Sequence, residues 1–130
     1  MTGPPIRSGY KPPPRALVVR GGVIAPNDLE KDARACLRQW GFQAVSVAVA
    51  DVLDLVDLMS QVNRFVARMP TVSVSTVERL AGYELVATFR APHFSLVVPS
   101  LDDKALRDLC LLFDIVKNPL VESAGRSPTH

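Results

Sequence analysis

Cysteine is scarce in this sequence, with two residues among 130. Cys36 and Cys110 both fall on the apolar faces of expected helices, where free thiols behave as small hydrophobic groups. No CxxC pair and no cysteine–histidine cluster occurs, which argues against zinc; we expect no metal and no cofactor. The glycine spacings of nucleotide-binding loops are missing as well. A disulfide stays open, although nothing in the sequence indicates secretion.

A long uninterrupted apolar run is also missing. The longest apolar stretch, residues 42–59, is broken by Asp51, Asp54 and Asp57, whereas a membrane-spanning helix needs about 18 apolar residues with almost no charge. The N-terminal segment has no hydrophobic region typical of a signal peptide. We therefore expect a cytoplasmic protein without membrane contact.

The net charge is only +2, so nucleic-acid binding does not follow from charge alone. The cations are unevenly placed, however, because no acidic residue precedes Asp28. Residues 1–15 form a basic arm whose prolines exclude helices and inner strands. Two interpretations stay open for this arm: contact with a partner, or a solvated tail. The cations that precede Asp28 are Arg7, Lys11, Arg15 and Arg20.

The composition between the two ends is that of an ordinary globular domain. Hydrophobic residues make up 48% of the chain and charged residues 22%. We expect a proline-rich basic arm at 1–15, a single globular domain at 16–116 and a polar tail at 117–130.

The first half of the domain predicts a strand at 16–20 and a helix that follows it. Asn27 and Glu30 have the spacing of a capping box at the helix start. Gly41 sits where a left-handed residue would end that helix. Residues 42–49 are apolar and β-branched on both faces, as in a central strand.

The middle of the domain predicts one long helix and a strand. The helix is expected to begin at Asp51 and to stop before Pro70. The strand is expected at 71–75, and a capping box formed by Ser75 and Glu78 would open a short helical turn after it.

The clearest pattern is a β-hairpin, because 83–89 and 94–98 both alternate between apolar and polar residues. Pairing Phe89 with Phe94 leaves residues 90–93 as the loop. A last helix is expected after Ser100. The resulting order is β-α-β-α-β-(short α)-β-β-α, which predicts an α/β fold, or α+β, with a mixed sheet of about five strands and three main helices.

The hairpin loop carries the main candidate site. His93 titrates near neutrality and suits a general acid or base, and Ser95 shares its strand face. Arg90 is its neighbour in the loop, and Arg20, followed by two glycines, ends the first strand; either guanidinium suits a phosphate. The alternatives are a turn histidine bonded to backbone and glycines that simply turn the chain.

Residues 75–99 resemble HicA-type mRNA-interferase toxins, in which a helix ends at glycine and a hairpin presents a catalytic histidine. Residues 82–84 match the helix–strand junction, and the resemblance implies that role for His93. Ala91 and Pro92 depart from the family's Gly-Ser before the histidine. The overall pattern also resembles small uncharacterised actinobacterial proteins.

Three functions stay open. The first is a non-catalytic protein-interaction module of toxin–antitoxin, immunity or assembly type, with a protein partner. The second is a small toxin-like enzyme that acts on RNA or a nucleotide through His93. The third is a small-molecule-binding domain. The oligomeric state does not follow from the sequence.

Overall fold

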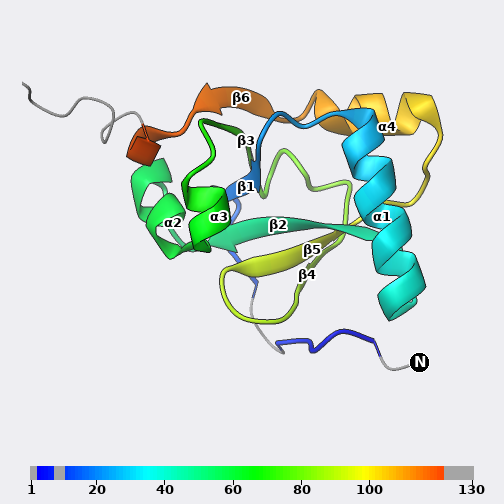
Figure 1. Ribbon diagram of the computed structural model, residues 1–130. Helices are drawn as coiled ribbons and strands as arrows, with labels where there is room; N and C mark the ends of the chain where they lie inside the picture. Colours follow the sequence, from blue (N-terminus) through cyan, green and yellow to red (C-terminus); the bar gives the residue numbers. More distant parts are fainter. Residues whose placement is uncertain (1–2, 8–10, 122–130) are drawn as a thin grey trace, which may run out of the picture.

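The structure, a computed structural model, describes residues 3–7 and 11–121 (Figure 1). Its centre is a six-stranded sheet with the order β4-β5-β2-β1-β3-β6. The strands are β1 (Leu17–Gly21), β2 (Ala44–Ala50), β3 (Thr71–Thr76), β4 (Leu85–Ala87), β5 (His93–Val97) and β6 (Asp114–Lys117). The helices are α1 (Pro26–Trp40), α2 (Leu55–Gln61), α3 (Arg64–Ala67) and α4 (Asp103–Cys110).

The predicted combination of helices with one sheet is confirmed, in its α+β form. The pairing differs from the expected mixed sheet, because every strand pair is antiparallel. Parallel pairing needs a connection that carries the chain back to the opposite end of the sheet. Helix α1 instead lies across the direction of β2 (Figure 1). Strand β2 therefore begins at the same end of the sheet at which β1 ends, and the two strands run in opposite directions. Leu17, the first residue of β1, pairs with Ala50, the last residue of β2.

Alternate side chains of the central strands enter two separate cores, one on each face of the sheet. In β1, Val18 packs with residues of α1 and α4, whereas Val19 packs with residues of α2. Leu29 of α1 and Leu58 of α2 are fully buried in these two layers. Among the described residues, none from β4 or β5 belongs to the second core. On the face of the sheet that α2 and α3 cover, the end formed by β5 therefore carries polar side chains.

The ends of α1 show one confirmed prediction and one correction. Gly41 has a φ of 83° and donates its N–H to the carbonyl of Leu37, as a left-handed cap does. The capping box at 27–30 does not form, because α1 starts two residues earlier with Ala25 as its N-cap. Pro26 takes the first helical position, where its fixed φ suits the helix and its missing N–H costs nothing.

The expected long helix after Asp51 is two short ones. Asp54 caps α2 by accepting a hydrogen bond from the N–H of Val56. Val62 is extended, and Asn63 then caps α3, with Oδ1 accepting from the N–H of Val66 at 3.0 Å. An asparagine side chain that bonds to nearby backbone competes with helix continuation, which explains the break.

Two further caps lie on neighbours of the predicted residues. The box at 75–78 does not form: Ser75 is buried within β3, and Thr76 Oγ1 accepts from the N–H of Arg79 instead. At the start of α4, Asp102 rather than Ser100 accepts the helix N–H, at 2.8 Å. Side-chain oxygens of either type satisfy these first N–H groups, so the sequence alone left neighbouring candidates equivalent.

The hairpin is confirmed, but its register differs from the predicted one by two residues. Ala87, not Phe89, pairs with Phe94. Phe89 has left the strand, with a φ of 56°. A shift by two residues keeps the same face toward the core, so the predicted apolar face is still buried.

The chain adds a sixth strand after α4, which the sequence analysis missed. Strand β6 pairs with β3 along the sheet edge. Asn118 follows it and is fully buried, and its amide nitrogen donates to the carbonyls of Ala67 and Met69, both at 2.9 Å. The packed part therefore continues past residue 116, and 122–130 of the expected tail lie outside the described residues.

Part of the proline-rich arm joins the sheet. Phe89 donates its N–H to the carbonyl of Pro5, and Arg7 donates its N–H to the carbonyl of Ala87. The guanidinium of Arg7 donates to the carbonyl of His93 and lies 5.2 Å from the ring centre of Phe94. Residues 5–7 thereby lie along residues 87–89 and cover the Ala87 end of the β4 edge; residues 1–2 and 8–10 of the arm lie outside the described residues.

Replacing Arg7 with alanine is expected to lower the free energy of unfolding by about 1–2 kcal/mol, because a charged hydrogen bond and a cation–π contact are both lost. Chemical denaturation measures this difference. Lys11→Ala is the matched control, since Lys11 is exposed. Equal midpoints for the two variants would show that the arm adds nothing to the fold.

Candidate functional site

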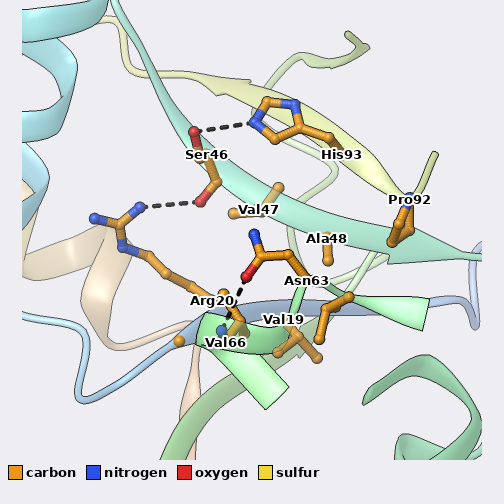
Figure 2. A pocket seen from close by; sticks show the side chains of 11 residues that line it. Val19, Arg20, Ser46, Val47, Ala48, Asn63, Val66, Pro92 and His93 are labelled. Atoms are coloured by element: carbon orange, nitrogen blue, oxygen red, sulfur yellow. Dashed lines mark hydrogen bonds between the residues drawn. The ribbon is translucent and has the colours of Figure 1, made fainter. Parts of the chain in front are cut away.

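The candidate site is a pocket of about 130 Å³ where α3 approaches the centre of the sheet (Figure 2). Its floor comes from β1 and β2, and its walls come from the α2–α3 break and the residue before β5. The apolar residues that line it are Val19, Val47, Ala48, Val62, Val66 and Pro92. Because an apolar cavity of roughly 150 Å³ holds benzene, the pocket suits a group about the size of a six-membered ring.

Four polar side chains from separate segments reach this pocket: Arg20, Ser46, Asn63 and His93. Arg20 and Ser46 come from neighbouring strands of the sheet, Asn63 from the cap of α3, and His93 from the start of β5. An apolar pocket with a few placed polar groups is the usual form of a small-ligand site.

The imidazole of His93 is held by two hydroxyl groups. Its Nε2 lies 3.1 Å from Ser46 Oγ, and its Nδ1 lies 2.9 Å from Thr88 Oγ1. The ring also packs edge-on against Phe89, with centres 5.0 Å apart. Burial lowers the pKa of His93 from its ordinary value, and the positive charge of Arg7 lowers it further. A hydrogen bond to the backbone of Thr88 raises the pKa but does not cancel the effect of burial. His93 is therefore mostly neutral at pH 7 and available as a base.

Ser95 lies behind this histidine rather than in the pocket. Its side chain is 4% exposed, and its Oγ lies 2.8 Å from Thr88 Oγ1. A chain of hydrogen-bonding groups thus runs from Ser95 through Thr88 and His93 to Ser46. Ser95 shares a strand face with His93, as predicted, but it reaches the imidazole only through Thr88.

Arg20 lines the same pocket as His93. Its Nη1 donates to Asp32 Oδ2 at 2.8 Å and to the carbonyl of Ser46 at 2.9 Å (Figure 2 shows the latter bond). Asp32 Oδ2 also accepts from the N–H of Ser46 at 3.0 Å. Within the described part of the chain, the remaining N–H groups of Arg20 donate to no protein atom.

Arg90 does not join the site. Its side chain is exposed and does not line the pocket. Its contact with the histidine is through the backbone, since its carbonyl accepts from the N–H of His93 at 2.8 Å. The structure therefore brings together Arg20 and His93 among the predicted site residues, and it leaves Arg90 and Ser95 outside the pocket.

Three residues of the site went unnoticed in the sequence. Ser46 is the one polar residue in an otherwise apolar strand, and a polar residue at such a position indicates that its side chain has a polar or solvent-exposed environment. Asn63 is a helix-capping type in the middle of an apolar helical pattern. Thr88 precedes the turn and carried no signal of its own.

Acidification is expected to destabilise this protein partly through His93. Because the folded state lowers the pKa of His93, the unfolded chain binds more protons below about pH 6.5, so the free energy of unfolding falls as the pH drops from neutrality. Denaturation at a series of pH values measures the slope. His93→Asn should flatten it between about pH 7.5 and about pH 5; an unchanged slope would contradict this origin.

No protein-family model, curated protein or solved structure matches this chain. Within residues 3–7 and 11–121, no group of three potential metal ligands comes together. No helix of that same part has both the length and the apolar character needed to span a bilayer.

Proposed function

We propose that this domain binds a small ligand in the pocket between α3 and the sheet. The ligand combines an apolar body of about ring size with an acceptor-rich head such as a carboxylate. The convergence of His93 and Arg20 on one apolar pocket supports this proposal. The apolar floor takes the body, and the unused N–H groups of Arg20 take the head. An RNA- or nucleotide-directed activity with His93 as acid or base would take place in this same pocket.

The test is a titration of the ¹⁵N-labelled protein with benzoate, phenyl phosphate and, as the uncharged comparison, benzyl alcohol. We expect the amide signals of Ser46, Ala48 and His93 to shift with benzoate, and Arg20→Met to weaken binding at least tenfold, about 1.4 kcal/mol. Arg34→Met is the matched control, since Arg34 is exposed on α1. Shifts confined to other surfaces, or equal affinity in both variants, would refute the proposal.

A second candidate is the protein-interaction module, and the two edges of the sheet favour it. Residues 5–7 cover the Ala87 end of the β4 edge, whereas no described strand pairs with the outer side of β6. Along an antiparallel edge strand, the backbone N–H and C=O groups of alternate residues point toward the neighbouring strand and away from it. Asn118 donates its N–H to the carbonyl of Pro70, on the β3 side. By this alternation, Ile115 and Lys117 direct their backbone groups away from β3. Ile115 is 51% exposed. We propose that an extended segment of a protein partner adds to this edge.

Such a partner would be a cytoplasmic component of a toxin–antitoxin, immunity or assembly system. A photo-crosslinking amino acid at position 115, introduced in the source cells, tests the proposal. One discrete adduct at 115 and none at the exposed control position Arg34 would support the β6 edge as the interface. No adduct at 115, or the same adducts at both positions, would refute it.

A further inference from the structure

We propose that Ser46 is a nucleophile activated by His93, and that the pocket hydrolyses small carboxylic esters. The proposal rests on the pocket being the ligand site proposed above. Its basis is the order of contacts: a pocket-lining hydroxyl lies 3.1 Å from His93 Nε2, and the other ring nitrogen is held by Thr88. A hydroxyl within reach of a base that a third group orients is the arrangement of an activated nucleophile.

The hydrogen-bond chain is compatible with the imidazole tautomer that the proposal needs. Thr88 Oγ1 has one proton and contacts both Ser95 Oγ and His93 Nδ1. If Thr88 donates to Ser95, it accepts from Nδ1–H of the neutral imidazole. Nε2 is then unprotonated and accepts the hydroxyl proton of Ser46. Burial supports this state, since it lowers the pKa of His93 and keeps the ring neutral near pH 7.

The surroundings of Ser46 fit an ester. Ser46 is exposed in the pocket, so a substrate can approach its hydroxyl. Asn63 Oδ1 is used by the N–H of Val66, and the Asn63 amide nitrogen points into the pocket (Figure 2). That nitrogen suits the oxygen that becomes negative during acyl transfer. The apolar lining of the pocket favours an ester, whose reacting group is uncharged, over a phosphodiester.

The reaction balances with water as the other reactant. Ser46 Oγ bonds to the ester carbonyl carbon as its proton passes to His93 Nε2. The tetrahedral intermediate collapses, the bond to the alcohol oxygen breaks, and the alcohol leaves with the proton from Nε2. Water then attacks the acyl-serine, His93 again takes and returns a proton, and a carboxylic acid leaves with Ser46 restored.

Covalent labelling tests the nucleophile without knowledge of the natural ester. An alkyl fluorophosphonate reacts with an activated serine by forming the Oγ–P bond and releasing fluoride. We expect mass spectrometry to find one adduct, on Ser46, and none in Ser46→Ala. Ser60→Ala is the matched control, since Ser60 is an exposed serine on α2, and it should label like the unchanged protein.

The role of the base is tested by rates. His93→Asn should slow labelling at least 100-fold, as expected for loss of a general base. In the unchanged protein, the rate should rise with pH through the lowered pKa of His93 and level off near neutrality; this profile needs no variant to fold. No adduct, an adduct on another residue, or a rate in His93→Asn equal to that of the unchanged protein would overturn the proposal.

The labelling result is separable from the ligand titration. The unchanged protein is both labelled with the fluorophosphonate and titrated with benzoate, so each result is obtained without a variant of the pocket. Benzoate binding without labelling would leave a binding pocket and reject the esterase. Labelling of Ser46 without benzoate binding would reject the proposed ligand class instead.

Discussion

Replacing Phe94 with alanine is expected to lower the free energy of unfolding by about 3–5 kcal/mol. Phe94 is 1% exposed and belongs to the core that α1 and α4 cover. It also lies beneath the guanidinium of Arg7, so its removal loosens the arm that covers the β4 edge. A change of this size removes a large part of the total stability of an ordinary domain.

Urea denaturation followed by circular dichroism measures the effect. Phe65→Ala is the matched control, because Phe65 is 75% exposed and its removal should change stability by less than about 0.5 kcal/mol. Phe94→Leu should fall between the two, since it leaves a smaller cavity. Equal midpoints for Phe94→Ala and Phe65→Ala would show that β5 does not pack as described.

The strands were the best-predicted part of the fold, because alternation reports which side chains face a core. Residues 71–75 and 94–98 fall within one or two residues of β3 and β5. Gly41 also ends α1 as predicted, since few residues other than glycine adopt a φ of 83°. These features depend on local chemistry that a single sequence carries.

Pairing direction and the broken helix depend on contacts between distant segments, so the sequence did not reveal them. A 15-residue helix between two strands fits a parallel crossover as well as the antiparallel arrangement seen for α1. Strand β6 is a four-residue edge strand at the end of an apolar helical pattern, and its pairing with β3 decides its form.

The candidate site also depends on contacts between distant segments, so the sequence indicated only some of its residues. Histidine and arginine attract attention because of their chemistry, and the prediction that His93 and Arg20 converge is consistent with the pocket. Ser46 and Thr88 are ordinary strand residues in sequence, and they matter only because the sheet register places them beside His93. Arg90 adjoins His93 in the chain, yet its side chain is exposed and away from the pocket.

The ion pair between Arg20 and Asp32 is expected to be the main stabilising interaction at the rim of the pocket. Arg20→Met and Asp32→Asn should each lower the free energy of unfolding by about 1–3 kcal/mol, because each leaves a partly buried partner without its bond. The side chains are 16% and 31% exposed, and Asp32 also holds the backbone N–H of Ser46. A double-mutant cycle should give a coupling of about 0.5–3 kcal/mol.

The pair Glu30–Arg34 on the same helix is the matched control, since both of its side chains are exposed and such pairs contribute about 0.3–0.5 kcal/mol. Equal couplings in the two cycles would contradict a structural role for Asp32.

The Asp32→Asn variant also links stability to binding. Removing the carboxylate charge leaves the guanidinium of Arg20 less neutralised, so benzoate should bind several-fold more tightly while the domain unfolds more easily. Weaker benzoate binding in Asp32→Asn would instead show that Asp32 is needed to hold Arg20 in place at the pocket.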